Sequence, residues 1–385
     1  MKKDSKFIPF ALPDIGDEEI QAVVKSMKSG WLTTGPVTKK FEAEFAKFIS
    51  VDECLAVSSA TAGLHLALQA INLQKNDTVL IPVNTFVATA EVVRYFDAHP
   101  VFIDIDFDTM NISIDYLTAY LENNDTSNIK AIIPVHIAGQ ACDMDEILKL
   151  AKKYNLFVIE DAAHAFPCKY KNQMIGSLQS DFTVYSFYAT KTITTGEGGM
   201  LVARNKKHLS LIKKLRLHGI SREIWDRYTS NKAHWHYDVD VLGYKYNLSD
   251  LCSSIGREQL KKANHFFNKR NSIAQKYNQA FKHLDIILPQ QKREDDQHAW
   301  HLYLIRTKNR DQILKFLKEK GIGTSLHFIP LHLMTYYQEL YHHKEDDFTI
   351  AMKSFSQLIS LPIYTKMSDE NIDYVISSLI EACSL

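Results

Sequence analysis

The stretch DFTVYSFYATKTITTGEGGML, residues 181–201, organises the chain around one lysine, Lys191. The β-rich run at residues 182–187 predicts a strand, and three glycines among residues 196–199 predict a tight backbone path after it. Lysine can hold an aldehyde cofactor as an imine, because burial lowers its pKa and frees the nitrogen lone pair for attack. Taken alone, Lys191 is better explained as one of the many surface lysines. Its surroundings in the rest of the chain decide between the two interpretations.

Short apolar runs alternate with helical patterns on both sides of this stretch. Strands are predicted at residues 55–57, 78–82, 101–105, 131–135, 157–159, 182–187 and 200–203. Helices are predicted between most of them, at residues 62–71, 87–96, 143–154 and 207–217. A helix over residues 13–28 and a second one after the loop GWLTTGP precede them. This alternation predicts an α/β fold, a mainly parallel sheet sandwiched by helices, with ligands at the carboxyl ends of the strands.

The second half of the chain departs from this alternation. A polar, aromatic segment at residues 218–238 predicts a binding or interface loop. The elements expected after it are a long helix (250–284), a strand (300–306), a helix (310–319), a strand (323–328) and two C-terminal helices. We therefore expect a large α/β domain over residues 1–248 and a smaller C-terminal α+β domain over residues 249–385.

Composition and charge exclude several classes of partner. The 45 Lys and Arg residues balance 45 Asp and Glu residues without a polybasic block, which argues against nucleic acid and acidic membrane surfaces. The opening MKKDSKFIPFALPD lacks the apolar run of a signal peptide, and no stretch is apolar enough to span a bilayer. Five dispersed cysteines without a CxxC pair favour reduced thiols. We expect a cytoplasmic protein that binds neither nucleic acid nor membrane.

Two pairs of histidines raise the alternative of a metal site. They are His327 with His332, and His234 with His236. Neither pair has a carboxylate or thiol at a supporting spacing, so we expect no metal.

Small hydroxyl residues precede a predicted helix in SSATAGLHLAL, residues 58–68, directly after the strand that ends at Val57. The free amide groups and the positive dipole end of a helix N-terminus suit a phosphate. A plain helix cap is the better explanation when the segment is taken alone, because Ser and Thr are common before helices.

Asp161 in IEDAAHAF, residues 159–166, comes directly after a buried strand. A carboxylate there is costly unless a cation or several donors pair with it, and a protonated pyridine nitrogen would be such a cation. An aspartate that caps the following turn is about as well supported. His164 either holds Asp161 or lines a cofactor face, although a satisfied structural histidine is the more common case.

Ser186 and Phe86 are candidates only in combination with the others. Ser186 could give a hydroxyl to the same phosphate, and Phe86 could stack on an aromatic ring. In isolation, a satisfied strand-end serine and helix-start core packing explain them better. Taken together, a phosphate cradle, a carboxylate and a lysine follow three strands of one sheet. They match the phosphate, the ring nitrogen and the aldehyde carbon of pyridoxal 5'-phosphate.

Over nearly its whole length the sequence resembles the DegT/DnrJ/EryC1/StrS family of nucleotide-sugar aminotransferases, which have the aspartate-aminotransferase fold (fold type I). The resemblance is carried by GWLTTGP, VSSATAGLHLAL, PVHIAGQACDMDEI, VIEDAAHAF, YSFYATKTITTGEGGML and LGYKYNLSDL. The branch that aminates UDP-4-keto sugars is the most similar, since it shares SSATAG, GYKYNLSD and HFIPLHL.

The resemblance implies a role for each candidate residue. Lys191 is the Schiff-base lysine and general base, and Asp161 pairs with the pyridine nitrogen. The other cofactor contacts are Ala60, Thr61 and Ser186 at the phosphate, Phe86 stacked on the ring, and His164 beside it. Asn247 resembles the residue that reaches the phosphate of the neighbouring subunit's cofactor, which implies a homodimer with shared active sites.

The implied reaction moves the amino group of L-glutamate to a nucleotide-linked 4-keto sugar, a UDP-4-keto-6-deoxy sugar, with pyridoxamine 5'-phosphate as the intermediate cofactor form. It serves surface polysaccharide, lipopolysaccharide or glycan biosynthesis. Trp31, Thr33 and His327 are candidate substrate contacts, with packing or dimer contact as an even alternative. The rival functions are amination at C3 of a dTDP-3-keto-6-deoxy sugar, and a regulatory protein that binds pyridoxal phosphate without turnover.

Overall fold

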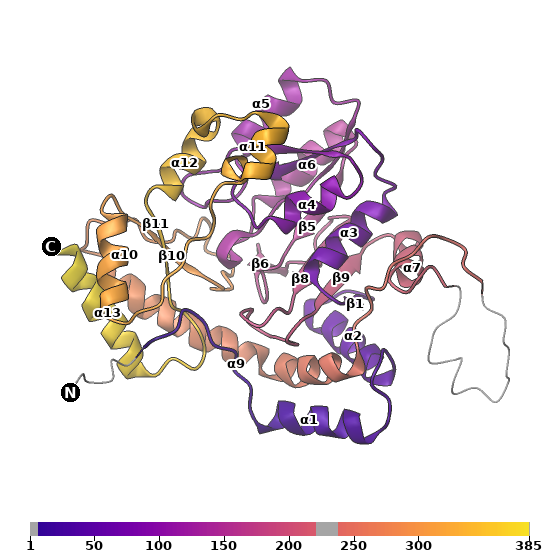
Figure 1. Ribbon diagram of the computed structural model, residues 1–385, viewed down its shortest axis with the longest axis horizontal. Coiled ribbons are helices and arrows are strands. Elements are labelled where there is room, and N and C mark those ends of the chain that lie inside the picture. The colour runs from indigo at the N-terminus through magenta and orange to yellow at the C-terminus, as the bar shows by residue number, and fades with distance from the viewer. Residues whose placement is uncertain (1–6, 221–237, 385) are drawn as a thin grey trace.

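A central β-sheet organises the computed structural model, which describes residues 7–220 and 238–384 (Figure 1). Within those residues the sheet has seven strands: β1 (Leu55–Val57), β2 (Thr78–Pro82), β3 (His99–Ile103), β4 (Ile129–Ile132), β5 (Phe157–Asp161), β8 (Phe182–Ser186) and β9 (Gly199–Ala203). Their order is β1-β9-β8-β5-β4-β2-β3. The strands from β8 to β3 are parallel, whereas β9 is antiparallel to both β1 and β8. The predicted mainly parallel sheet is confirmed.

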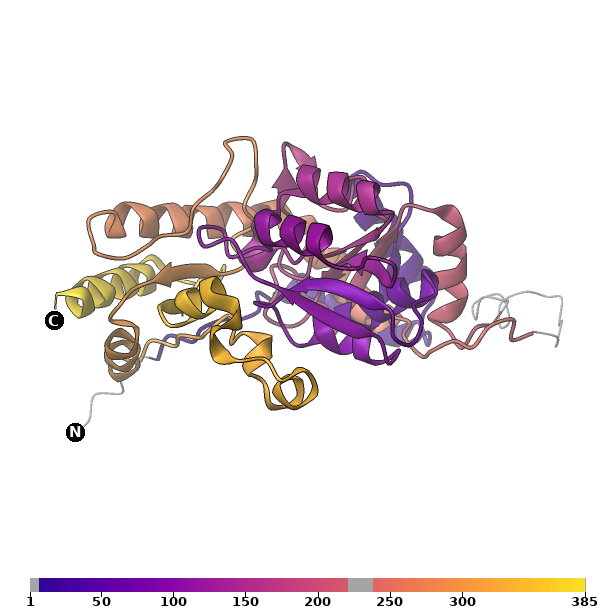
Figure 2. The ribbon, with the colours of Figure 1, turned by 90° about the horizontal axis from the view of Figure 1, so that it is seen from above.

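Helices cover both faces of this sheet (Figure 2). Residues on one face pack against α3 (Ala60–Ala70), α4 (Ala88–Arg94) and α7 (Lys206–Leu215). The other face packs against α2 (Pro36–Ile49), α5 (Ile114–Asn123), α6 (Met144–Tyr154) and the first part of α9 (Asp250–Phe281). A short hairpin of β6 (Lys169–Tyr170) and β7 (Gln173–Met174) lies outside the sheet. The helix-covered sheet is the sandwich that the strand-helix alternation predicts.

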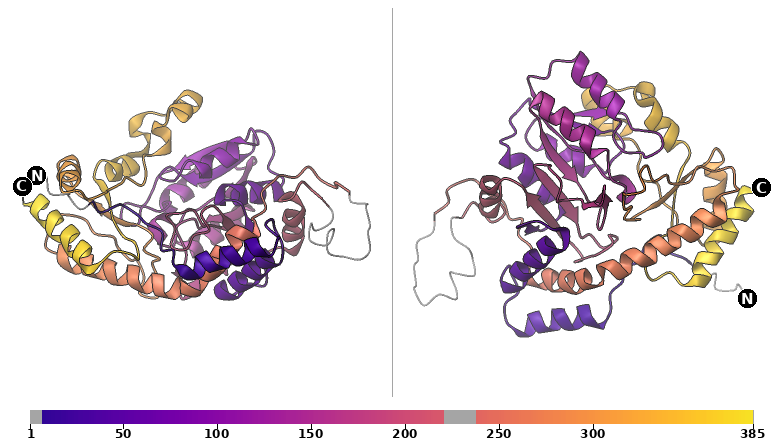
Figure 3. Two further views of the ribbon diagram at one scale, coloured as in Figure 1. Left: turned by 60° about the horizontal axis from the view of Figure 1, so that its bottom comes forward. Right: turned by 180° about the vertical axis from the view of Figure 1, so that it is seen from behind.

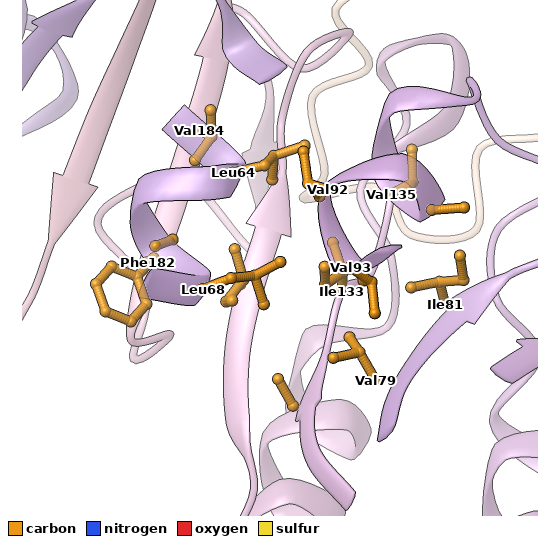
Figure 4. Close-up of a cluster of buried hydrophobic side chains, with 14 of the residues drawn as sticks. Leu64, Leu68, Val79, Ile81, Val92, Val93, Ile133, Val135, Phe182 and Val184 are labelled. Carbon is orange, nitrogen blue, oxygen red and sulfur yellow. The ribbon is translucent and has the colours of Figure 1, made fainter. Parts of the chain in front are cut away.

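The two-residue period of the strands decides which face each side chain occupies. Leu64 and Leu68 of α3 belong to the same buried cluster as Val79 and Ile81 of β2, on the first face of the sheet (Figure 4). Burying each such side chain contributes about 1.5–3 kcal/mol.

The same period separates two neighbouring carboxylates of β5. Ile159 belongs to the core on the α3 face, so Asp161, two residues on, projects to that face as well. Glu160 projects to the opposite face, where it lies 2.9 Å from Nε2 of His136 and accepts a 2.8 Å hydrogen bond from the Thr183 hydroxyl. Asp161 therefore faces the helix that follows β1, the predicted phosphate cradle.

A long helix links the sheet to a C-terminal group of elements (Figure 3). Helix α9 starts beside α1 (Asp17–Lys28) and α2, and its later residues join a third core with α10 (Arg310–Glu319), α13 (Asp369–Cys383), β10 (Tyr303–Arg306) and β11 (Leu358–Leu361). Ile8 from the other end of the chain packs into the same core. The division into domains at residue 249 stays a prediction. None of the helices placed in the described ranges combines the length and apolarity needed to cross a membrane.

Several predicted elements of this C-terminal part are wrong. Residues 323–328 form no strand: Ser325 makes an isolated bridge to Ser360, and the partner of β10 is β11, which the sequence analysis missed. Three helices follow, α11 (Thr335–Tyr341), α12 (Thr349–Phe355) and α13, rather than two. The four-residue run of β11 is too short to show a strand period against the helical patterns on either side.

Elsewhere α5 and the β6–β7 hairpin were not predicted, and the other differences lie at the ends of elements. The helix predicted over residues 13–28, with Asp14 or Asp17 as its first residue, begins at Asp17 as α1, because Glu19 accepts a hydrogen bond from the backbone N–H of Gly16 and fixes the N-terminus there. Strands β3 and β4 begin two residues earlier than predicted. Of the predicted loop at residues 218–238, positions 221–237 lie outside the described residues.

Candidate active site

Lys191 lies in the tight loop that joins β8 to β9. Backbone hydrogen bonds close the base of the loop, from Phe187 N–H to Gly198 C=O at 2.8 Å and from Thr195 N–H to Phe187 C=O at 3.0 Å. Burial lowers the pKa of Lys191 to about 8, and the charge of Asp161 acts in the opposite direction. The loop therefore carries an amine that loses its proton at a lower pH than an ordinary lysine, as a nucleophile or base requires.

Asp161 ends β5 and is 5% exposed. Its Oδ2 accepts a hydrogen bond from the Thr89 hydroxyl at 2.9 Å, and its Oδ1 accepts one from the backbone N–H of Ala163 at 3.1 Å. Burial raises the pKa of Asp161, while these hydrogen bonds and the Lys191 charge lower it. Two neutral donors stabilise a buried carboxylate less than a cation does, so a protonated ring nitrogen would suit this position.

The N-terminus of α3 forms the cradle predicted around Ala60 and Thr61. Ser59 caps the helix by accepting a 3.0 Å hydrogen bond from Ala62 N–H. Gly199 of β9 lies directly beneath, and a Cβ there would approach the Ala60 nitrogen to 2.9 Å. Ser186 is the β8 residue paired with Gly199, so its hydroxyl belongs to the same corner. Backbone N–H groups, a helix dipole and a hydroxyl together suit a phosphate.

Phe86 and His164 lie on either side of Phe328. The ring centroids of Phe86 and Phe328 are 6.0 Å apart, and those of Phe328 and His164 are 5.9 Å apart at an interplanar angle of 23°. Phe86 is 56% exposed, which is far more than the core packing considered for a lone phenylalanine. An exposed ring beside a buried imidazole can cover the face of a planar cofactor.

Sequence reasoning missed Thr89, Asn84, Phe328 and His301 in this site. Asn84 lies two residues after the end of β2, and its Oδ1 accepts a 3.0 Å hydrogen bond from Phe328 N–H. A polar residue at the carboxyl end of a strand was an available signal for Asn84. His301 falls within the strand predicted at residues 300–306, and no sequence pattern predicts its contact with His164.

The predicted substrate contacts fall into two groups. Burial, and then the charge of nearby Lys191, lower the pKa of the His327 imidazole to about 4, and its Nδ1 is 2.8 Å from the Ser360 hydroxyl. Trp31 and Thr33 belong instead to the loop before α2. Buried Asp250 fixes that loop by accepting hydrogen bonds from the backbone N–H groups of residues 35, 37 and 38 at 2.8, 3.1 and 2.9 Å.

Asn247 lies with this second group. Its amide donates to the Thr34 hydroxyl at 2.5 Å, and Thr34 C=O accepts a 3.2 Å hydrogen bond from the Trp31 indole. The neighbouring Tyr246 C=O accepts a 2.7 Å hydrogen bond from Ser58 N–H, which ties this segment to the α3 cradle of its own chain. The predicted reach of Asn247 across a dimer stays a prediction.

Lys191, Asp161 and the α3 N-terminus provide the three groups that pyridoxal 5'-phosphate requires: an amine, a buried carboxylate and a phosphate cradle. Gly199 lets the start of α3 approach the beginning of β9 more closely than a side chain would allow. Across the described ranges, no three side chains of His, Cys, Asp or Glu group in a way that could hold a metal ion. The residues therefore fit the organic cofactor.

Comparisons with known proteins show the family to which the chain belongs. The sequence profile of the DegT/DnrJ/EryC1/StrS aminotransferase family matches residues 13–380. Spore coat polysaccharide biosynthesis protein SpsC of Bacillus subtilis is 43% identical over 386 residues, which cover 98% of each chain.

Solved structures match over nearly the same length, at lower sequence identity. Spr1654 of Streptococcus pneumoniae, by name a sugar aminotransferase, has a TM-score of 0.90 and 32% identity in its PMP form, over 98% of this chain and 99% of its own. Helicobacter pylori PseC, an aminotransferase involved in the biosynthesis of pseudoaminic acid, has a TM-score of 0.90 and 27% identity over 98% of this chain and 100% of its own. Spr1654 is also solved in a PLP form. This chain belongs to the DegT/DnrJ/EryC1/StrS aminotransferase family, with fold type I and pyridoxal 5'-phosphate as its cofactor.

Proposed function

We propose that this protein transfers the amino group of L-glutamate to C4 of a nucleotide-linked 4-keto-6-deoxy sugar, with UDP as the nucleotide, in surface polysaccharide or glycan biosynthesis. The observation that carries the aminotransferase chemistry is the pair of Lys191 and Asp161 on one buried face beside a phosphate cradle. The names of SpsC, Spr1654 and PseC support a sugar as the acceptor and a polysaccharide or a related sugar as the product. A cytoplasmic location stays a prediction.

Each catalytic residue has one task in this reaction. Bound pyridoxal 5'-phosphate supplies the electron sink that makes removal of a proton from the amino-acid Cα feasible. The Lys191 amine takes that proton and, in the sugar half-reaction, delivers one to C4. Asp161 keeps a proton on the nitrogen that faces it, because its buried carboxylate is stabilised by a neighbouring cation. Asp161 is buried and Lys191 is half-buried, which limits the access of water to the transfer.

The position of the new amine in the product distinguishes amination at C4 from amination at C3. The enzyme is incubated with L-glutamate and either a UDP-4-keto-6-deoxy sugar or a dTDP-3-keto-6-deoxy sugar, and NMR locates the new amine. An amine at C4 of the UDP sugar supports the proposal, whereas an amine at C3 of the dTDP sugar replaces it with the rival reaction. If glutamate leaves the absorption band of the bound cofactor unchanged and no sugar is aminated, the result favours a regulatory protein that binds pyridoxal phosphate without turnover.

The pKa of Lys191 predicts how cofactor attachment depends on pH. Only the neutral amine attacks an aldehyde, so the attachment rate to cofactor-free protein should rise with pH, with a midpoint at about 8. Stopped-flow absorbance after mixing with pyridoxal 5'-phosphate measures this rate. A midpoint near the ordinary lysine value of about 10.4 would show that burial does not depress the pKa.

A shared active site predicts subunit complementation. Asn247→Ala should weaken cofactor retention about tenfold, roughly the contribution of one hydrogen bond to a charged phosphate. If Asn247 serves the partner's site, mixing inactive Lys191→Ala subunits with Asn247→Ala subunits creates heterodimers in which one site has both native residues. Cofactor retention in the exchanged mixture should then recover in part. Unchanged retention in Asn247→Ala, or no recovery after verified subunit exchange, contradicts the shared site.

A further inference from the structure

Three imidazoles from distant parts of the chain gather around Lys191. His164 follows β5, His301 lies two residues before β10, and His327 lies between α10 and α11. The ring centroids of His164 and His301 are 4.4 Å apart. The charge of Lys191 acts on all three rings. They form one group beside the reacting amine, and we refer to these three residues as the histidine cluster.

The cluster has hydrogen-bonding capacity that the described protein does not use. The Nδ1 atoms of His164 and His301 are buried without a partner there, as is the Nδ2 atom of Asn84. His164 is 8% exposed and His301 is 6% exposed. Buried polar atoms without partners destabilise a fold, so several of them at one place indicate a ligand that completes them. Among the cofactor contacts assigned above, Lys191, Asp161 and the α3 cradle supply the polar groups and His164 lies beside the ring, so none of these contacts uses the three nitrogens.

The cluster is uncharged when no ligand is present. Burial lowers the pKa of His327 to about 4 and holds those of His164 and His301 well below the ordinary value. The charges that face the cluster act in the same direction, since Lys191 and, at His301, Arg270 of α9 both oppose a further positive charge. Asp161 is the carboxylate that acts on Lys191 from β5.

A site that is neutral when empty suits the two substrates of the proposed function, on which this inference rests. The amino-acid donor brings a carboxylate next to the reacting carbon, whereas the sugar ring that later takes its place is uncharged there. A fixed buried cation would be left unpaired when the sugar binds. An imidazole can accept a proton when the carboxylate arrives and lose it when the carboxylate leaves.

We propose that His164, His301 and His327 form the subsite that receives the carboxylate of the amino-acid donor, and that the cluster takes up a proton from solvent when the carboxylate binds. The Asn84 amide adds an uncharged donor to the same subsite. The proton is shared within the His164 and His301 pair, because rings this close titrate together.

Proton uptake is measured by isothermal titration calorimetry of the cofactor-loaded protein with glutarate, a dicarboxylate without an amino group. Titrations in two buffers of different ionisation enthalpy, at about pH 7.5, should show uptake of about one proton per site. The absorption band of the bound cofactor is followed in parallel, so that protonation of the cofactor is counted separately. Glutarate binding without uptake, or no glutarate binding, overturns the proposal.

Variants then assign the uptake to the cluster. His301→Gln keeps a polar side chain but cannot titrate, so uptake should fall by at least about half and the glutarate Kd should rise about tenfold. His283→Gln, at an exposed position on the surface, is the matched control and should change neither value. His327→Asn provides a second variant if His301→Gln does not fold. Wild-type uptake in both cluster variants overturns the assignment.

L-Glutamate separates this inference from the function on which it rests. If glutamate converts the cofactor band but glutarate brings no proton uptake, the subsite is wrong and the aminotransferase stands. If glutarate is bound with uptake but neither glutamate nor a keto sugar reacts, the carboxylate subsite stands and the proposed function is wrong.

Discussion

Lys191→Ala is expected to abolish transamination, with kcat reduced by at least about 10⁴-fold, because the substitution removes both the amine that binds the cofactor and the base that moves the proton. The fold should survive. The buried amine is destabilised as a cation, as its pKa of about 8 shows, so its loss does not remove a stabilising charge. Single-turnover absorbance with L-glutamate measures the chemical step, and circular dichroism confirms the fold.

Two further measurements distinguish the two roles of Lys191. A small primary amine added to Lys191→Ala can move the proton but is not tethered, so it should restore part of the rate in proportion to its concentration. Lys207→Ala, on an exposed position of α7, is the matched control and should retain the wild-type rate. Wild-type transamination by Lys191→Ala would refute the assignment of this lysine.

The large α/β part of the fold could be predicted because its strands are short, apolar and separated by strong helical patterns. The strand before Lys191 and the helix after Val57 both lie within two residues of their predicted positions. The polar residues that follow these strands then predicted Asp161 and the α3 cradle as parts of one site, because the carboxyl ends of parallel strands lie at the same edge of the sheet.

The missed parts of the site depend on contacts between residues that are far apart in sequence. His301 reaches His164 because Ala299 N–H donates to Gly139 C=O at 2.8 Å and Leu302 N–H donates to Ala138 C=O at 3.2 Å. Those bonds carry the segment before β10 to the end of the sheet, and no local pattern encodes them. Thr89 looked like an ordinary helix residue, although its hydroxyl is one of two donors to Asp161.

Asp161→Asn is expected to lower kcat by about 100- to 1000-fold, a loss of the size seen when one electrostatic contact to a developing charge is removed. Asparagine preserves the shape of the side chain and can still bond to Thr89 and Ala163, but it cannot hold a proton on a facing ring nitrogen. The buried position makes this loss larger than it would be in water. Pre-steady-state kinetics with L-glutamate measures the effect on proton removal.

The neighbouring carboxylate provides the matched control. Glu160→Gln changes the same strand one residue earlier, but Glu160 faces His136 and Thr183 on the opposite side of the sheet. We expect it to lower thermal stability while kcat stays within about twofold, since surface and packing changes away from a site rarely alter chemistry. A cofactor analogue methylated at the ring nitrogen, which keeps its positive charge permanently, should restore much of the rate to Asp161→Asn and nothing to Lys191→Ala. If Asp161 acts by keeping the ring nitrogen protonated, a nitrogen that cannot lose its positive charge no longer needs the carboxylate. A wild-type rate in Asp161→Asn, or no rescue by the analogue, would show instead that Asp161 acts by packing.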